Sequence, residues 1–338
     1  MSKTFNRFKK KSLTIAYAIF PEEFLYFLED IKNKKLIQCS FNPQRNININ
    51  SIAKAHSNKV NFIIKLNNFE IISGGCEIIK IWNLSSGKCT KELKGHTSLV
   101  LCLQKLTKTQ IVSGSSDETI KLWDITSGVC LKTLGYLSFV FYIAKISNLQ
   151  IVSGWRDANV IIYDLPTGTY KKCYSHKSAV LCITKVSKTQ IASAGRDRTV
   201  ILWDFKEEKC LMKLTGHTNY ILGISKLTKT QIVTAGSDKL IKIWDLPTKS
   251  CVKTLKGHTD YVNCVTKLNK SLIVTGSNEN KIKLWNIDTG KCLMDLKSHD
   301  TSVECIIKLN KNQLVIGNFD CSITLIDLSY HEINMHSH

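Results

Sequence analysis

The side chains best suited to catalysis are a histidine, a hydroxyl residue and an aspartate that occur together. His96, Ser113 and Asp117 supply the base, nucleophile and orienting carboxylate that nucleophilic hydrolysis uses. The same combination returns as His176, Ser193 and Asp197, as His217, Thr234 and Asp238, and with a Glu as His258, Thr275 and Glu279. An active site does not return several times at a fixed step, so the set indicates a structural unit and not a catalytic centre.

A step of 40 or 41 residues organises most of the chain. Each unit opens near a Gly-His pair, such as Gly95-His96, and closes on an aromatic-acid pair. Seven copies of this frame span residues 55–328. The closing pairs are Trp82-Asn83, Trp123-Asp124, Tyr163-Asp164, Trp203-Asp204, Trp244-Asp245, Trp285-Asn286 and Ile326-Asp327.

Each copy predicts four short strands. In the second copy these are "LVLCLQKL", "QIVSGS", "TIKLWDI" and "VCLKTL", separated by turn-forming residues. An isolated sheet with this pattern would leave apolar side chains exposed on both faces. We therefore expect the copies to stack face to face around an axis.

These repeats resemble those of WD-repeat β-propellers. The resemblance implies an all-β fold, a seven-bladed β-propeller of four-stranded antiparallel blades closed by an N-terminal strand. In that family a His, a strand Ser or Thr, a turn Asp and a Trp form a hydrogen-bonded network inside each blade. The resemblance implies three complete networks. They consist of His96, Ser113, Asp117 and Trp123; of His176, Ser193, Asp197 and Trp203; and of His217, Thr234, Asp238 and Trp244.

Three copies depart from this pattern. The third has Tyr136 and Tyr163 in place of the His and the Trp, and the seventh has Ile316 and Ile326 in place of the Ser or Thr and the Trp. The first copy is one residue short in "SGGCEIIKIW", which leaves Glu77 or Cys76 in the place of the Asp.

The predicted domain limits follow from the repeats. Residues 45–328 form the propeller, and the stretch "NININSIAKAH" provides the outer strand that the last copy lacks, pairing with residues 323–327. Residues 1–44 form an N-terminal extension, in which Pro21 and an apolar stripe predict an amphipathic helix near residues 21–33. Residues 329–338 are expected to be a flexible tail.

Composition limits the classes of partner. The 338-residue chain has a formal charge of +20, but 42 of its basic residues are Lys and only five are Arg. Arg is the residue of bidentate recognition, so this balance favours solubility and gives little support for specific nucleic-acid binding. No apolar run is long enough for a membrane helix. We expect neither a cofactor nor a metal site, since no Cys/His cluster has zinc spacing.

Nine of the 13 cysteines fall at two fixed places in the repeat. One register holds Cys102, Cys182, Cys264 and Cys305, and the other holds Cys89, Cys130, Cys210, Cys251 and Cys292. Repetition at one register predicts small buried residues and not disulfide pairs. We therefore expect free, buried thiols and a cytoplasmic protein, with the nucleus as an alternative.

The candidate partner-binding residues lie where the copies differ. In WD-repeat propellers, contacts with partners concentrate at the residues three and five places after the His and at the residue just before the turn Asp. At these places, or beside them, the chain has Leu99, Leu101, Phe139, Phe141, Trp155, Arg156, Arg196, Tyr220, Leu222 and Tyr261. The apolar residues suit either packing between blades or docking of a peptide, and the arginines suit an acidic or phosphorylated segment.

A lysine stands nine residues after each His position, in all seven copies. We expect these lysines at one mouth of the channel, where they either hold an anion or extend into water.

The chain is accordingly predicted to be a monomeric, non-enzymatic scaffold or adaptor that binds proteins or peptides. Two alternatives stay open. One is a substrate receptor of a ubiquitin ligase, because "FPEEFLYFLEDI" is similar to the first helix of an F-box. The other is a propeller enzyme, which would need a catalytic group in the channel that breaks the repeat symmetry.

Overall fold

The computed structural model describes residues 49–52, 54–298 and 300–328. The chain divides into two units, Met1–Arg45 and Asn46–His338, and all described residues belong to the second. The predicted helix near residues 21–33 and the predicted tail at 329–338 therefore lie outside the described residues. Over the described ranges, no helix has the length and apolar character needed to cross a membrane.

The described strands form seven four-stranded antiparallel sheets, one for each copy of the repeat. Blade one contains β2 (Phe62–Lys65), β3 (Glu70–Gly74), β4 (Ile79–Asn83) and β5 (Lys88–Leu93). Blade two contains β6 (Val100–Lys105), β7 (Gln110–Ser115), β8 (Thr119–Asp124) and β9 (Cys130–Gly135). Blade three contains β10 (Val140–Lys145), β11 (Gln150–Trp155), β12 (Asn159–Asp164) and β13 (Tyr170–Ser175).

The remaining blades repeat this order. Blade four contains β14 (Val180–Lys185), β15 (Gln190–Gly195), β16 (Thr199–Asp204) and β17 (Lys209–Thr215). Blade five contains β18 (Ile221–Lys226), β19 (Gln231–Gly236), β20 (Ile241–Asp245) and β21 (Ser250–Leu255). Blade six contains β22 (Val262–Lys267), β23 (Leu272–Ser277), β24 (Lys281–Asn286) and β25 (Cys292–Lys297).

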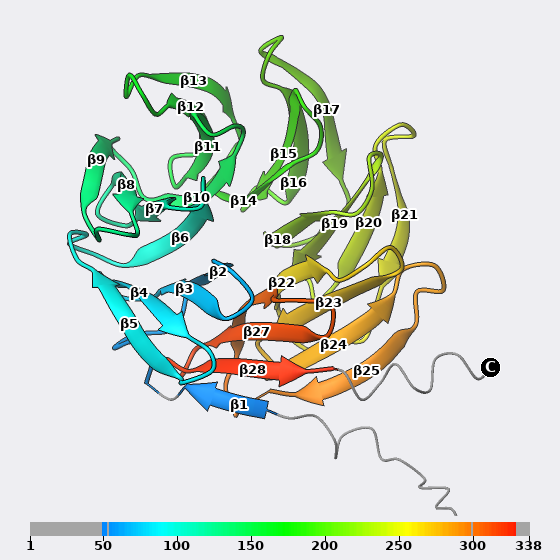
Figure 1. Cartoon of the computed structure of the whole chain (residues 1–338). Helices are drawn as coiled ribbons and strands as arrows, with labels where there is room; N and C mark the ends of the chain where they lie inside the picture. Colours follow the sequence, from blue (N-terminus) through cyan, green and yellow to red (C-terminus); the bar gives the residue numbers. More distant parts are fainter. Residues whose placement is uncertain (1–48, 53, 299, 329–338) are drawn as a thin grey trace, which may run out of the picture. The chain divides into compact units, whose positions relative to one another are not determined.

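Blade seven joins the two ends of the described chain. It contains β26 (Val303–Lys308), β27 (Gln313–Asn318), β28 (Ile323–Asp327) and β1 (Ile49–Ile52), in the sheet order β1-β28-β27-β26. The antiparallel register places Ile49 opposite Ile326 and Ile52 opposite Ile323. This pairing confirms the predicted closure by an N-terminal strand, and Figure 1 shows the resulting ring of blades.

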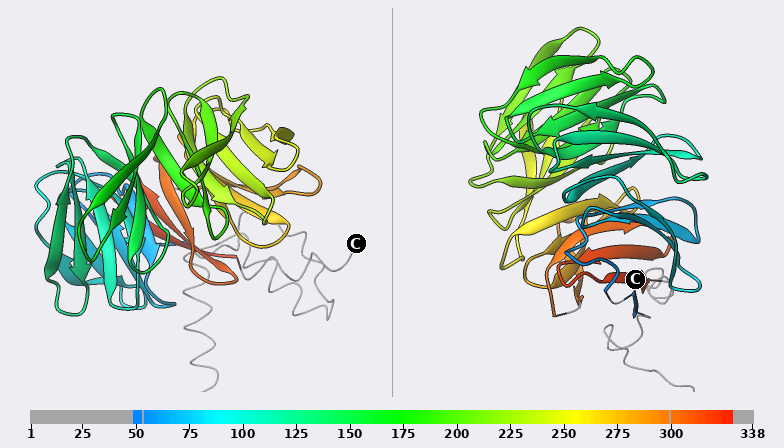
Figure 2. Two further views of the ribbon diagram at one scale, coloured as in Figure 1. Left: turned by 90° about the horizontal axis from the view of Figure 1, so that it is seen from above. Right: turned by 90° about the vertical axis from the view of Figure 1, so that its left-hand side faces the viewer.

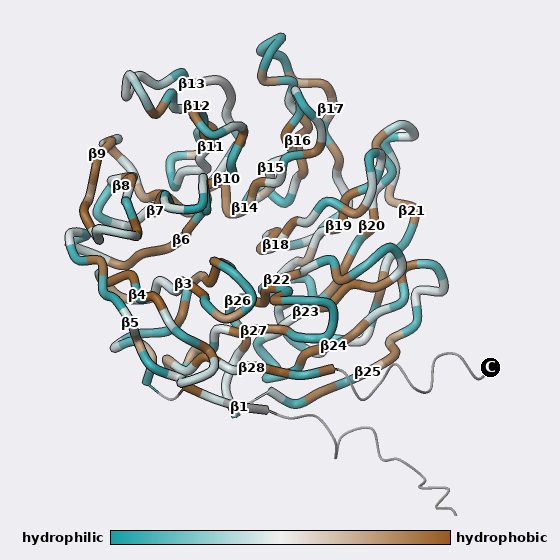
Figure 3. Tube along the Cα trace, in the orientation of Figure 1, coloured by the Kyte–Doolittle hydropathy of each residue, from teal (hydrophilic) through white to brown (hydrophobic). Residues whose placement is uncertain are grey.

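The hydrophobic core lies between the blades. The second strand of each blade is almost wholly buried, as in β7 and β11. A side chain at Gly114 would place its Cβ only 2.5 Å from Cγ1 of Val140 in the next blade, so the glycine lets two sheets approach closely. The views in Figure 2 show the twisted sheets side by side, and in Figure 3 hydrophobic segments lie along the strands while the turn between β16 and β17 is hydrophilic.

A bulge interrupts the inner strand in six of the seven blades. It falls on the residue five places after the His position, for example between Val140 and Tyr142 at Phe141. A bulged residue is left out of the ladder, so its side chain can be redirected. These residues line the central cavity, as described next.

Candidate functional site

The repeated His, Ser or Thr, Asp and Trp residues form a buried hydrogen-bonded chain in blades two, four and five. In blade two, Trp123 Nε1 donates to Ser113 Oγ at 2.8 Å, and Ser113 Oγ lies 2.6 Å from His96 Nε2. His96 Nδ1 lies 2.6 Å from Asp117 Oδ2. Because a carboxylate only accepts, Nδ1 carries the proton and Nε2 accepts the Ser113 hydroxyl.

The equivalent contacts in blades four and five have nearly the same lengths. His176 lies 2.7 Å from Ser193 and 2.9 Å from Asp197, and Trp203 donates to Ser193 at 2.7 Å. His217 lies 2.7 Å from Thr234 and 2.8 Å from Asp238, and Trp244 donates to Thr234 at 2.8 Å. Each network therefore ties the loop before the inner strand to the second and third strands.

The pKa shifts match a structural role. Burial lowers the pKa of His96 and keeps the imidazole neutral, although Asp117 acts in the opposite direction. Burial also opposes ionisation of Asp117, but hydrogen bonds from Thr119 and His96 lower its pKa overall. The hydroxyl of Ser113 already receives the Trp123 proton, and the His96 side chain has no exposed surface. A substrate therefore has no access to these groups.

Blade one keeps part of this network. His56 Nε2 lies 2.7 Å from Ser73 Oγ, and Trp82 Nε1 donates to the same oxygen at 2.8 Å. The place of the Asp is taken by Cys76, whose Sγ lies 3.5 Å from His56 Nδ1, whereas Glu77 is exposed. Burial, followed by the charge of Lys80, lowers the pKa of His56 to about 4.

In blade three an aromatic cluster replaces the network. Trp155 is fully buried, and its Nε1 donates to Ser153 Oγ at 2.7 Å. The prediction that Trp155 contributes to a partner surface is therefore wrong. Trp155 supplies from β11 the indole that Trp123 supplies from β8 in blade two, because Tyr163 occupies the usual Trp position and packs against it. Tyr136, in the place of the His, packs on Trp155 with ring centroids 4.8 Å apart.

The Gly-His loops and the turns after the second strands share one face of the propeller, called the Gly-His face below. The backbone N–H groups of Arg156 and Arg196 donate to the carbonyls of Phe139 and Ala179, which precede the inner strands. On this face the Arg156 guanidinium lies over the ring of Phe139, 4.8 Å from its centroid. Arg196 lies 5.7 Å from the centroid of Tyr220, in the next blade.

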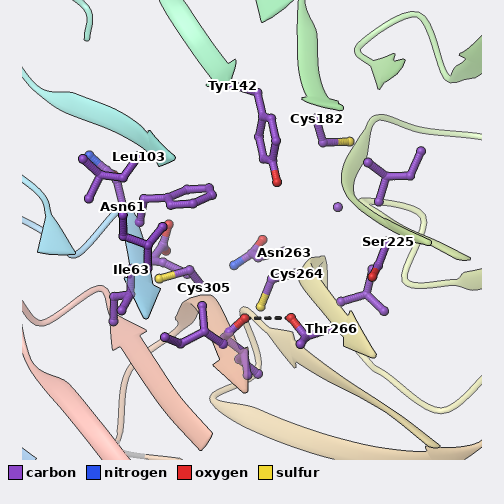
Figure 4. Close-up of a pocket in the computed structure, with 18 of the residues that line it drawn as sticks. Asn61, Ile63, Leu103, Tyr142, Cys182, Ser225, Asn263, Cys264, Thr266 and Cys305 are labelled. Atoms are coloured by element: carbon purple, nitrogen blue, oxygen red, sulfur yellow. Dashed lines mark hydrogen bonds between the residues drawn. The ribbon is translucent and has the colours of Figure 1, made fainter. Parts of the chain in front are cut away.

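The other predicted partner residues divide between two places. Tyr220 and Tyr261 are exposed on the Gly-His face, and Leu99 and Phe139 are half-buried there. Leu101, Phe141 and Leu222 sit at the bulges and line the central cavity. Figure 4 shows this cavity, with Tyr142, Asn61 and Asn263 extending into it from different walls. The predicted set therefore does not form one continuous surface.

Two exposed apolar residues on the Gly-His face were absent from the predicted set. Leu137 has 92% of its surface exposed and lines a hollow of about 320 Å³ with Phe139 and Arg156. Phe319 is 57% exposed, and the ammonium of Lys59 lies over its ring. A signal for Leu137 existed, because the residue after the His position is polar or charged in the other copies, as at Thr97 and Lys177.

The two cysteine registers differ in burial. Cys102, Cys182 and Cys305 are buried between blades, and burial raises the pKa of Cys305 to about 12. In the other register Cys89, Cys210, Cys251 and Cys292 are exposed, so the prediction of buried thiols is wrong there. These residues lie on outer strands, which no neighbouring strand covers. Within the described residues, no group of three or more His, Cys, Asp or Glu could hold a metal ion.

Comparison with known proteins supports the fold. The profile of the WD domain, G-beta repeat family (WD40) matches residues 87–124, 168–204, 208–245 and 249–286. No curated protein sequence matches the chain. Each matched segment runs from the turn before an outer strand to the aromatic-acid pair of the following blade. The chain therefore contains WD40 repeats at four positions and folds as a seven-bladed β-propeller.

Proposed function

We propose that the protein is a scaffold or adaptor whose Gly-His face binds a partner segment with acidic or phosphorylated side chains. WD40 propellers generally act as non-catalytic scaffolds for protein interaction, and the family is typically non-enzymatic. The observation that carries the finer proposal is the pair of stacked arginines, Arg156 on Phe139 and Arg196 on Tyr220.

Stacking suits these arginines to anion recognition. An aromatic ring beneath the guanidinium holds its plane while the N–H edge stays available for a bidentate contact with a carboxylate or phosphate. Neither guanidinium has a carboxylate partner among residues 49–52, 54–298 and 300–328. The exposed Leu137 beside Arg156 provides an apolar contact for a neighbouring residue of the same segment.

A degenerate library of phosphoserine and phosphothreonine peptides, with unphosphorylated copies, tests the proposal. The double variant Arg156→Ala/Arg196→Ala should weaken binding of the selected phosphopeptides by about 2 kcal/mol, roughly 30-fold, in fluorescence anisotropy. The control is Lys108→Ala/Lys188→Ala, which removes the same charge from exposed turns after inner strands. Equal weakening in both variants, or equal binding of both peptide forms, would contradict the proposal.

Location in a reducing compartment, such as the cytoplasm, is part of the proposal. It is supported by the 11 cysteines whose side chains the structure describes, all of which are free thiols. Export of the protein in an oxidised form would contradict it, and fractionation of cells that express the full chain tests this.

The ubiquitin-ligase hypothesis depends on residues 1–44, which lie outside the described residues. It stays a prediction. Affinity purification with and without residues 1–44 distinguishes it from a plain scaffold, because only a receptor loses ligase subunits on truncation.

A further inference from the structure

Every inner strand of the propeller ends on a lysine, and each lysine bonds to the preceding blade. These residues, called the lysine ring below, are Lys65, Lys105, Lys145, Lys185, Lys226, Lys267 and Lys308. Each Nζ donates to the carbonyl oxygen just after the preceding inner strand, at Leu309, Leu66, Leu106, Ile146, Val186, Leu227 and Leu268 respectively. The ammonium groups are therefore held in place around the channel.

The positive charge of the lysine ring is not neutralised within the described residues. No salt bridge there includes any of the seven lysines. Two acidic residues near this end accept other hydrogen bonds: Glu70 accepts from Asn67, and Asp124 accepts from the backbone of Thr126 and Ser127. An ammonium has three donors and a carbonyl takes one, so most of the ring retains donors for a ligand.

The lysine ring lies at one end of a cavity of about 580 Å³ that the inner strands surround. Lys65, Lys105 and Lys308 are among the residues that line it. Toward the Gly-His face the cavity is lined instead by uncharged bulge residues and by Glu304, which pairs with Lys59 at 2.7 Å. Charge of one sign at the mouth of a low-dielectric cavity concentrates the field on that mouth.

The turns beside the lysine ring add to this field. Each inner strand is followed by a turn of four residues, and none of the seven turns contains an acidic residue. Five of them have a further exposed lysine, which are Lys108, Lys188, Lys229, Lys270 and Lys311.

We propose that the lysine ring binds a compact small molecule with several phosphate groups, for which inositol hexakisphosphate is a suitable probe. Donors arranged around an axis suit a ligand with anionic groups around its circumference, which engages several lysines at once. Lysines act as point charges and do not require the planar geometry of an Arg contact. A long polyanion lying across this end would instead contact the exposed turn lysines. The site is remote from the Gly-His face, so this inference does not depend on the proposed function.

Calorimetric titration of the full chain at about 0.15 M salt tests the proposal. Inositol hexakisphosphate should bind with one molecule per chain and raise the melting temperature, whereas inositol and inorganic phosphate should do neither. The variant Lys105→Gln/Lys185→Gln/Lys267→Gln should bind at least about tenfold more weakly, because three of the seven ring charges are lost.

The matched control is Lys108→Gln/Lys188→Gln/Lys229→Gln, which removes three exposed charges from the adjacent turns. It should retain wild-type affinity within about twofold. If the ring variant does not fold by circular dichroism, the single variant Lys185→Gln replaces it, with about threefold weakening expected.

Equal weakening in the ring and turn variants would overturn the proposal in favour of diffuse attraction to a chain of charge +20. Tighter binding of a poly-glutamate peptide or a single-stranded oligonucleotide, unaffected by the ring substitutions, would overturn it in favour of a macromolecule. An absence of binding heat and of a thermal shift would also refute it.

Discussion

Blades two and three use different side chains at the four positions of the His, Ser or Thr, Asp and Trp network. In blade two a polar chain runs from Trp123 through Ser113 and His96 to Asp117. In blade three the hydroxyl of Ser153 still accepts an indole proton, but its own proton goes to the carbonyl of Ile161 at 3.2 Å. Both blades therefore keep an indole on this hydroxyl, and the group beyond it is polar in blade two and aromatic in blade three.

The place from which the indole comes also differs. Trp123 belongs to the third strand of its blade, and Trp155 ends the second strand of its own. Tyr163 then fills the space of the missing third-strand Trp, but its hydroxyl is buried and has no hydrogen-bond partner among the described residues. Blade three thus gains aromatic packing and retains an unsatisfied polar atom.

The largest expected effect tests whether the two indoles are equivalent. Trp123→Ala and Trp155→Ala should each lower the free energy of unfolding by about 3–5 kcal/mol, because both remove a fully buried aromatic side chain. Urea denaturation measures the change. A Trp155→Ala variant with wild-type stability would restore the idea that this residue serves a partner.

A smaller loss of stability is expected on removing the turn Asp, and this loss should be larger in blade two than in blade three. Asp117→Ala should cost about 2 kcal/mol, since it leaves the buried His96 Nδ1 without its acceptor. Asp157→Ala should cost less, because Asp157 is exposed and bonds mainly to its neighbour Asn159. Thermal melts of the two variants provide the comparison, and equal losses would show that blade three depends on its Asp as blade two does.

Acidification should weaken blades one, two and six, whose buried histidines have lowered pKa values. Burial lowers the pKa of His56 to about 4 from 6.5, and it also lowers the pKa values of His96 and His258. Below pH 6.5 the unfolded chain therefore binds more protons than the folded one, and stability falls by about 1.4 kcal/mol per pH unit for each such group until the folded pKa is reached.

The carboxylates extend this loss to lower pH. The pKa of Asp117 is lowered from 3.8, so its stabilising effect is complete above that value and is lost as pH falls through its folded pKa. Urea titrations between pH 7.5 and 4.5 test the histidine part. His56→Phe, which brings blade one closer to blade three, should reduce the slope, and a flat wild-type profile over this range would rule out neutral buried imidazoles.

The smallest expected effect is a gain in stability. Tyr163→Phe removes the unsatisfied hydroxyl and keeps the ring, so it should raise the free energy of unfolding by about 1 kcal/mol. Tyr136→Phe is the control, because the Tyr136 hydroxyl accepts a hydrogen bond from Asn159 at 3.1 Å and its loss should destabilise. A destabilised Tyr163→Phe variant would indicate a partner for that hydroxyl.

The spacing of Gly-His and Trp-Asp pairs was enough to predict seven four-stranded copies, because these depend on local turns and strand alternation. The closing strand was predicted from the resemblance to WD-repeat propellers, and the pairing of β1 with β28 confirms it. The role of Trp155 could not be predicted in this way. Its position is usually occupied by a small residue such as Ser115, and only the neighbouring Tyr136 and Tyr163 signal that the interior has been rebuilt. The orientation of the Phe141 side chain could not be predicted either, since a bulge depends on the register between strands.

The lysines at the strand ends illustrate the same limit. Their recurrence predicted a position at one mouth of the channel. It did not predict that Lys145 donates to the carbonyl of Leu106, in another blade. Such a contact depends on how closely the blades pack, which the sequence of one repeat does not specify. Likewise, the outer cysteines share a register with each other, and periodicity alone did not distinguish an outer strand from a covered one.

The pairing of β1 with β28 has a consequence for biosynthesis. These strands come from opposite ends of the propeller sequence, so β1 has no partner in its sheet until β28 has left the ribosome. Contacts of such long sequence separation form late and carry a large loop-closure cost. The earlier blades can stack as they emerge, but a nascent chain that stalls before β28 keeps an open edge at each end of an incomplete ring.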